Sequence, residues 1–346
     1  MKKILVTGGA GFIGVNAARR FAKSGDRVAV LDDLSRKGSP ENLEWLRGEA
    51  SFDFHRADVR DAAKVGEIVG SLRPDVVLHL AGQVAVTTSV SDPRTDFEIN
   101  ALGTFNVLEA ARRRSPESIL LNASTNKVYG KLENLAVELR DGRWEFADRP
   151  DGVAEDQPLD FHSPDGCSKG AADQYVLDYA RIYGLRTLTF RQSCIYGTRQ
   201  MGVEDQGWVA WFTIASVLGK PVSIYGDGRQ IRDLLWIEDL LDLYEAGIAG
   251  AERGDTGAFN AGGGAANTLS LRELLAHLER LNGRALEHRY EEWRPGDQKV
   301  FVCDTGKAER ELGWRPRTSV GAGLERLYSW IVSERGLFER QFGRAG

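Results

Sequence analysis

Val6–Gly14, VTGGAGFIG, joins a short apolar run to a segment with apolar residues at helical spacing. This pattern predicts a strand, a glycine turn and a helix. Gly8, Gly11 and Gly14 stand where a tight turn, close approach of the backbone to a ligand and close helix–strand packing each exclude a side chain. The amides at a helix N-terminus attract anions. The stretch is therefore typical of a loop that binds the pyrophosphate of a dinucleotide.

Apolar, β-branched runs alternate with helical patterns over the first half of the chain. We expect strands at residues 3–8, 27–32, 52–58, 75–81, 118–124 and 185–192, and helices at 12–25, with Gly25 at its C-terminal end, and 104–114. Strands that alternate with helices imply βαβ units, and hence a parallel sheet covered on both faces. The predicted fold is α/β, a Rossmann-type doubly wound parallel sheet with a smaller mixed α/β C-terminal domain.

The chain changes character twice after the predicted fifth strand. Residues 131–164 are polar and acidic, and we expect a folded flap beside the site, because Trp144, Phe146 and Phe161 can be buried; the alternative is a disordered surface excursion. Residues 220–244 read as a turn-rich hairpin followed by a helix, and 269–283 and 305–336 read as helices. We predict a dinucleotide-binding domain at 1–192, with 230–262 returning to it, and a substrate-binding domain at 193–346.

Composition excludes several classes of protein. The net charge of −5 and the absence of a basic run argue against nucleic acid or an anionic membrane as the main partner. Cys167, Cys194 and Cys303 are far apart and odd in number, and their distances from the five histidines fit no zinc spacing, so neither a disulfide framework nor a metal is expected. No segment approaches the length of a membrane span. We expect a soluble, cytoplasmic protein.

Asp32 ends the second predicted strand, about 20 residues beyond the glycines, where a carboxylate can accept both ribose hydroxyls. The same carboxylate repels a 2′-phosphate, which favours NAD over NADP. The basic residues Arg36 and Lys37 would favour NADP instead, unless they lie in a solvated turn or contact a phosphate elsewhere. Asp58 and Val59, after the third strand, are plausible neighbours of the adenine.

The glycine loop, NAST followed by KVYG (residues 122–130), and SPDGCSK (163–169) together resemble the extended short-chain dehydrogenase/reductase family, the NAD-dependent epimerases and dehydratases of nucleotide-linked sugars. The resemblance covers essentially the whole chain. Further segments, among them HLAGQVAVTTSV (79–90), STNKVYG (124–130) and QIRD (230–233), are similar to the 2-epimerases of CDP-linked deoxyhexoses more than to the UDP-galactose 4-epimerases. The resemblance implies cofactor contacts from Gly8, Gly11, Phe12, Ile13, Gly14, Asp32, Asp33, Ser35, Arg36, Asp58, Val59, Leu80, Ala81, Gly82, Asn100 and Lys169.

The same resemblance implies a reaction centre of Thr125, Asp165 and Lys169. Thr125 matches the family's serine or threonine that bonds the reacting oxygen, and Lys169 matches the lysine that binds the nicotinamide ribose. Asp165 stands where the family has a tyrosine. An aspartate starts at a pKa of about 3.9, and a neighbouring ammonium lowers it further, so we expect an ionised, weak base paired with Lys169 one helical turn away.

Three interpretations of Asp165 stay open. Another group, such as a water, Lys169, Tyr129, Tyr196, His162 or Cys194, completes the proton transfer; or the reaction differs, as in an elimination; or the change inactivates the site and leaves an NAD-binding sensor.

On the substrate side, the resemblance implies that Arg232 pairs with the pyrophosphate of a nucleotide-linked sugar, with a CDP-sugar favoured. The remaining residues predicted to contact substrate are Gln83, Thr88, Ser89, Thr125, Asn126, Arg199, Gln206, Arg294 and Asp297. The predicted activity is transient oxidation and re-reduction of a sugar carbon by bound NAD, with a dehydratase or lyase as the alternative. Family resemblance also implies a homodimer or homotetramer.

Overall fold

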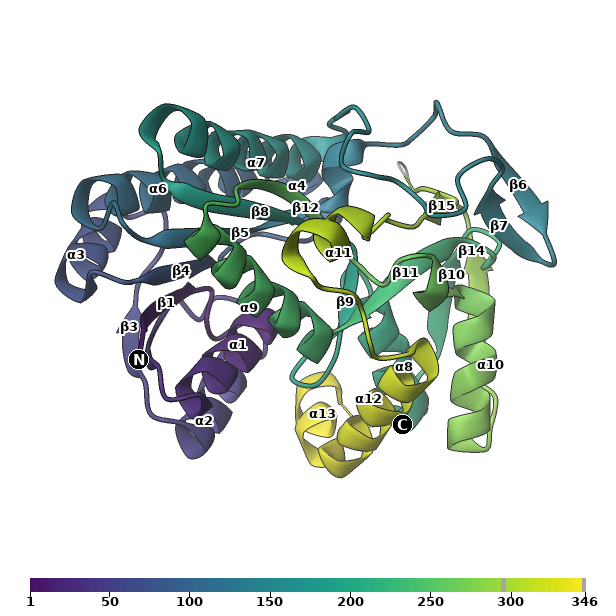
Figure 1. Cartoon of the computed structure of the whole chain (residues 1–346). Coiled ribbons are helices and arrows are strands. Elements are labelled where there is room, and N and C mark those ends of the chain that lie inside the picture. The colour runs from purple at the N-terminus through teal and green to yellow at the C-terminus, as the bar shows by residue number, and fades with distance from the viewer. Residues whose placement is uncertain (294–296, 344–346) are drawn as a thin grey trace.

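A computed structural model describes residues 1–293 and 297–343. Its largest element is a seven-stranded parallel sheet in the order β12-β8-β5-β4-β1-β2-β3 (Figure 1). The strands are β1 (Lys3–Thr7), β2 (Arg27–Asp32), β3 (Asp53–Arg56), β4 (Val76–His79), β5 (Ile119–Thr125), β8 (Arg186–Gln192) and β12 (Gly257–Ala261). The strand order reverses between β1 and β4, which is the switch point where doubly wound sheets bind ligands. The predicted Rossmann-type fold is confirmed.

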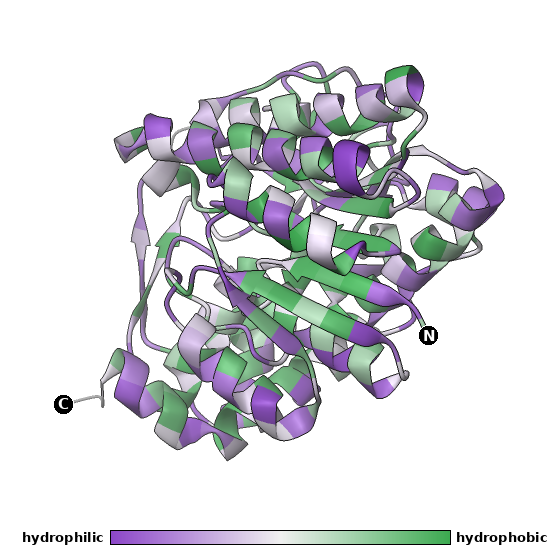
Figure 2. Ribbon diagram, turned by 90° about the vertical axis from the view of Figure 1, so that its left-hand side faces the viewer, coloured by the Kyte–Doolittle hydropathy of each residue, from purple (hydrophilic) through white to green (hydrophobic). Residues whose placement is uncertain are grey.

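Helices cover both faces of this sheet. One face packs against α3 (Ala62–Leu72), α6 (Gly103–Arg114) and α7 (Ser163–Tyr183), and the other against α1 (Phe12–Lys23) and α9 (Ile237–Arg253), with α2 (Ser39–Glu49) beside α1. Because both faces are buried, the strands are almost continuously apolar. In Figure 2 they are mostly green, the colour of hydrophobic residues, whereas the helices around them carry both green and purple residues. Helix α1 ends at Lys23, and Gly25 follows with φ of 91°, as the sequence predicts.

Four short helices lie in the first half: α4 (Val86–Ser91), α5 (Pro93–Phe97), the π-helix η1 (Glu98–Leu102) and the 3₁₀ helix η2 (Asn126–Tyr129). A second 3₁₀ helix, η3 (Ala265–Asn267), lies between β12 and β13.

The C-terminal part forms two small sheets and a group of helices. One sheet joins β9 (Cys194–Tyr196), β11 (Ile231–Trp236), β13 (Thr268–Ser270) and β15 (Val300–Phe301), and the other joins β10 (Val222–Tyr225) and β14 (His288–Glu291). The helices are α8 (Trp208–Leu218), α10 (Leu271–Asn282), α11 (Gly306–Leu312), α12 (Val320–Ser333) and α13 (Arg335–Phe342).

The predicted hairpin within 220–244 is wrong. Strands β10 and β11 pair with different partners, because the turn between them, with Gly226 and Gly228 at positive φ, carries the chain from one sheet to the other. The segment 230–262 is likewise divided, since β11 joins the small sheet and β12 joins the large one.

Residues 131–164 form the predicted folded flap. Strands β6 (Val137–Arg140) and β7 (Arg143–Phe146) make a hairpin whose two-residue turn, Asp141-Gly142, has positive φ at both positions (Figure 1). Trp144 donates its ring N–H to Asp227 at 2.9 Å, and Phe146 is buried in a cluster that includes residues of β11 and β15. The flap is thus packed onto the C-terminal sheets.

Candidate active site

A cavity of about 1160 Å³ follows the carboxyl ends of the parallel strands. One wall consists of residues that end or follow β1, β2, β3, β4, β5 and β8, and the facing walls come from the flap, β9, β10, β11 and α8. Pockets for a single drug-sized ligand measure roughly 300–1,000 Å³. The cavity can therefore hold a dinucleotide together with a second ligand.

The glycine loop forms the cradle at one end of the cavity. A Cβ on Gly8, whose φ is 66°, would lie 2.6 Å from the Ala81 nitrogen, and a Cβ on Gly14 would lie 2.2 Å from the Gly8 oxygen. No side chain caps the N-terminus of α1, so its first amides face the cavity without a side-chain partner. The glycine backbone leaves no room for side chains, and the helix N-terminus has no side-chain cap. Both features fit a loop that binds the pyrophosphate of a dinucleotide.

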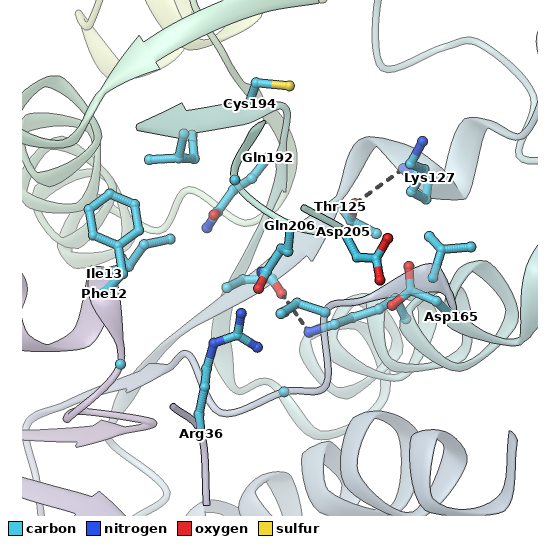
Figure 3. Close-up of a pocket in the computed structure, with 18 of the residues that line it drawn as sticks. Phe12, Ile13, Arg36, Thr125, Lys127, Asp165, Gln192, Cys194, Asp205 and Gln206 are labelled. Carbon is cyan, nitrogen blue, oxygen red and sulfur yellow. Dashed lines mark hydrogen bonds between the residues drawn. The ribbon is translucent and has the colours of Figure 1, made fainter. Parts of the chain in front are cut away.

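Asp32 lies at the carboxyl end of β2, beside this loop. Its two oxygens accept from the Ala10 and Leu34 amides at 2.9 and 2.8 Å, which fixes the carboxylate at the cavity wall. Burial raises the pKa of Asp32, an effect that these amide bonds partly offset. Arg36 extends from the next loop into the cavity (Figure 3). The residues predicted to hold the cofactor all line the cavity except Asn100.

Asn100 lies behind the residues that line the cavity. It lies in the π-helix η1, and its amide nitrogen donates to Asp96 and Ser168, each at 3.1 Å. Its amide oxygen accepts from the Gln83 backbone at 2.9 Å. Asn100 therefore positions the segment after β4 rather than the ligand.

Thr125 and Asp165 lie on the wall opposite Phe12 and Ile13 (Figure 3), and Lys169 lines the same cavity. Thr125 ends β5, and the other two residues lie one turn apart on α7. The predicted ion pair is wrong: the Lys169 ammonium donates to the Ala123 carbonyl at 3.4 Å, and no ion pair of Asp165 is found within the described part of the chain. One carboxylate oxygen of Asp165 is buried without a hydrogen-bond partner there.

Asp165 also differs electrostatically from the prediction. It is 3% exposed, and burial raises its pKa to about 6, although Lys169 and Lys127 oppose the rise and Asp96 adds to it. The predicted low pKa is wrong, because loss of hydration outweighs the nearby ammonium groups. Burial lowers the pKa of Lys169 in turn, while Asp165 and Asp96 partly restore it. A carboxyl with a pKa near 6 can both accept and release a proton close to neutral pH.

Arg232, Gln206 and Asp297 line the cavity, as predicted, and Gln206 lies near Gly11, Phe12 and Arg36. The Arg232 guanidinium donates to the carbonyls of Ile231 and Gln298, each at 2.8 Å, and these bonds fix its position on the wall. Arg294 lies outside the described residues.

Five residues predicted to contact substrate do not line the cavity. Ser89 is fully buried and donates to the Val86 carbonyl, while its neighbour Thr87, rather than Thr88, reaches the wall. The Gln83 side chain bonds Ala85 and Asp96. The remaining two of the five, Asn126 and Arg199, bond other parts of the protein. Asn126 is buried and accepts from Thr125, and Arg199 packs against the rings of Trp45 and Trp330 and pairs with Glu334 at 3.2 Å.

The described residues include no group of three or more His, Cys, Asp or Glu side chains that could hold a metal ion. No helix in residues 1–293 and 297–343 is long and apolar enough to cross a membrane.

The family model for GDP-mannose 4,6-dehydratase matches residues 5–327. The chain belongs to this family of NAD-dependent epimerases and dehydratases. CDP-paratose 2-epimerase of Salmonella typhi is 44% identical over 96% of this chain and 99% of that protein. Two solved structures match with a TM-score of 0.83: UDP-glucose 4-epimerase of Thermotoga maritima with UDP-glucose, at 30% identity over 96% of this chain and 99% of that one, and dTDP-glucose 4,6-dehydratase of Streptomyces venezuelae with NAD, at 29% identity over 98% and 99%.

Sequence reasoning missed several wall residues of this epimerase–dehydratase site. Lys127 lines the cavity, and burial, together with the charge of Arg232, lowers its pKa. Gln192, Gln200 and Gln230 line it as well. Lys127 comes two residues after the end of β5, a position from which the sequence could have suggested it. The 3₁₀ turn of η2, rather than the alternation of a strand, sets which of these side chains faces the cavity.

The suggested substitutes for the missing tyrosine divide into two groups. His162 and Cys194 line the cavity. Tyr129 and Tyr196 are each 1% exposed and are absent from its walls, and burial raises the pKa of both phenols. Neither phenol is placed to exchange a proton with a bound ligand.

The glycine cradle gives a direct test. Gly14→Ala should lower the free energy of unfolding by about 1–3 kcal/mol and abolish dinucleotide binding, because the new methyl group overlaps the Gly8 carbonyl. Gly48→Ala is the matched control: this helical glycine has no atom within 4 Å of a new Cβ, and its stability should change by about 1 kcal/mol or less. Urea unfolding and titration with NAD measure both effects. Unchanged NAD binding by Gly14→Ala would exclude this loop as the cofactor site.

Proposed function

We propose that this protein is an NAD-dependent epimerase of a nucleotide-linked sugar, acting on carbon 2 of a CDP-linked deoxyhexose. The observation that carries the proposal is that one cavity is lined by a dinucleotide cradle, by Thr125, Asp165 and Lys169, and by Arg232. The choice of CDP and of carbon 2 is supported by the 44% identity to CDP-paratose 2-epimerase over nearly the whole of both chains.

Asp32 supports NAD rather than NADP, because a fixed carboxylate at this point accepts ribose hydroxyls and repels a 2′-phosphate. NAD, when bound, supplies an acceptor and later a donor of hydride. Lys169, with its ammonium near the end of β5, is proposed to hold the cofactor's ribose.

In this proposal the Thr125 hydroxyl bonds the reacting sugar oxygen. Asp165 accepts the hydroxyl proton as the sugar carbon is oxidised to a ketone, and returns it when the other face of the carbon is reduced. Proton and hydride both go back to the sugar, so the reaction is an isomerisation without net redox change. Asp165 takes the role that the family resemblance gives to a tyrosine, and its pKa of about 6 supports that role.

Incubation of the purified protein with CDP-paratose in D₂O, followed by NMR, tests the reaction. We expect a 2-epimer with no deuterium at carbon 2, because the hydrogen that leaves as hydride returns as hydride. Loss of water with a change in product mass would instead indicate a dehydratase. Absence of any product from CDP-paratose and UDP-glucose, despite NAD binding, would indicate a sensor.

A cytoplasmic homodimer or homotetramer stays a prediction. Apolar side chains exposed on α6 and α7, among them Phe105, Tyr175 and Ile182, support self-association through these helices. Light scattering is expected to give two or four times the chain mass of 38.2 kDa. A mass of a single chain at micromolar concentration would contradict the oligomer.

A further inference from the structure

Asp96, on α5, is a buried carboxylate beside the helix that carries Asp165. It is 1% exposed, and its two oxygens accept from three side chains. The amide nitrogens of Gln83 and Asn100 donate to one oxygen at 3.0 and 3.1 Å, and the Ser168 hydroxyl donates to the other at 2.5 Å. Hydrogen bonds donated to a carboxylate stabilise its ionised form. Asp96 therefore holds a fixed negative charge inside the protein.

The bond to Ser168 places this charge against one turn of α7. Ser168 lies between Asp165 and Lys169, and its hydroxyl also contacts the Asp165 carbonyl at 3.3 Å. Residues three apart on a helix are neighbours on its surface, so the two carboxyl groups of Asp96 and Asp165 lie on the order of 10 Å apart or closer. Asp96 is not among the residues that line the cavity, and it can act on the reaction centre only through α7.

Asp96 has no cationic partner to neutralise it. Its three donors are uncharged, and no ion pair of Asp96 is found in the described part of the chain, whereas the buried Asp173 of α7 pairs with an arginine at 3.1 Å. Burial raises the pKa of Asp165 and Asp96 adds to the rise, while Lys169 and Lys127 oppose it. Further charged or titratable side chains of α5, η1 and the neighbouring loops are at least partly exposed: Arg94, Glu98, Asp160, His162 and Asp205.

We infer that Asp96 is a positioning residue of the reaction centre, whose buried negative charge disfavours a second one at Asp165 and keeps that carboxyl able to hold a proton. The inference rests on the proposed function, because it bears on the reaction only if Asp165 carries the proton of the sugar hydroxyl. Like charges held close together in a poorly hydrated site disfavour each other's ionisation. A carboxylate that takes up a proton more readily is also the stronger base, so the charge of Asp96 assists the oxidation step.

Asp96→Asn removes the charge and keeps the shape of the side chain. The asparagine oxygen can accept from Gln83 and Asn100 as the carboxylate does. Its amide nitrogen can donate to Ser168, whose own hydroxyl can then turn to the Asp165 carbonyl that it already contacts. The hydrogen-bond network can therefore survive the loss of the charge.

Carbon-13 NMR of the NAD-loaded protein, labelled at the carboxyl carbons of aspartate, follows the protonation of Asp165 without any substrate. The resonance of Asp165 is the one that is missing from Asp165→Asn. Its titration midpoint should lie about 1 pH unit lower in Asp96→Asn than in the unmodified protein. The apparent pKa of kcat/KM should move in the same direction by a similar amount, because the same proton limits the activity.

Two further variants separate the charge from other effects. Ser168→Ala removes the hydrogen bond between Asp96 and α7 but keeps the charge. Asp178→Asn removes a half-exposed carboxylate from the same helix, about 20 Å along its axis from Asp165. Both should leave the midpoint of Asp165 within about 0.3 pH unit of its value in the unmodified protein, since solvent and salt screen a distant exposed charge.

The outcomes separate this inference from the proposed function. An unchanged midpoint in Asp96→Asn, or an equal shift in Ser168→Ala, would overturn the role of the Asp96 charge. If the midpoint falls in Asp96→Asn but the apparent pKa of kcat/KM stays fixed, or no substrate is turned over, the charge acts as inferred and the proposed role of Asp165 in the reaction is wrong. Circular dichroism spectra and NAD affinities equal to those of the unmodified protein exclude misfolding of the variants as the cause.

Discussion

Replacement of Asp165 by asparagine is expected to lower kcat by about 100- to 10,000-fold, because an amide cannot carry the proton assigned to this carboxyl. The same substitution should stabilise the folded protein at about pH 8. Burial raises the pKa of Asp165 from 3.8 to about 6, so ionising it inside the fold costs up to about 3 kcal/mol of stability. Activity and stability should therefore change in opposite directions.

The stability effect has a defined pH dependence. The folded protein binds this proton more tightly than the unfolded chain, whose aspartate keeps its ordinary pKa. The cost of ionisation is thus fully present above about pH 6 and disappears below about pH 4. Urea unfolding of the unmodified protein and Asp165→Asn at about pH 8, 6 and 4 measures it. A stability difference that does not shrink as the pH falls would show that the carboxylate is not held charged in a poorly hydrated site.

The activity of the unmodified protein should follow the same titration. If Asp165 accepts the proton, kcat/KM falls below an apparent pKa of about 6, because the protonated carboxyl cannot act as a base. In Asp165→Tyr, which restores the residue that the family resemblance implies, kcat/KM should no longer fall with this apparent pKa. Higher activity in Asp165→Tyr than in the unmodified protein would mean instead that Asp165 is an inactivating change.

Replacement of Asp173 by asparagine is expected to lower the free energy of unfolding by about 3–5 kcal/mol. Asp173 and Arg191 form an ion pair at 3.1 Å, with side chains only 0% and 5% exposed. Removing the carboxylate leaves the guanidinium buried without its counter-charge, which is far more costly than losing an exposed pair. Asp173 also accepts from Ser124 at 2.8 Å, so the end of β5 that carries Thr125 should loosen as well.

Asp53→Asn is the control for this change. Asp53 pairs with Arg27 at 3.0 Å, but both side chains are at least half exposed, and such pairs contribute about 0–1 kcal/mol. Urea unfolding of the two variants under one set of conditions compares them. Equal losses of stability would show that burial does not set the value of the Asp173–Arg191 pair.

The sequence by itself determined the elements whose cause is local. The glycines of Val6–Gly14, the apolar strands and Asp32 at the end of β2 follow from steric exclusion, hydrophobic periodicity and spacing, and each is found where the pattern places it. The Asp-Gly turn of the flap is equally local, although the hairpin it closes was not foreseen.

Only the tertiary structure decided which partners these elements meet. Strand pairing separated β10 from β11, because pairing depends on segments far away in the sequence. Packing between distant elements turned Arg199 toward two tryptophans and set Lys127 and Gln230 on the cavity wall. It also buried Asp165 and so reversed the direction of its pKa shift. Hydration of a side chain is a property of everything packed around it, and neighbours in the sequence are too few to fix it.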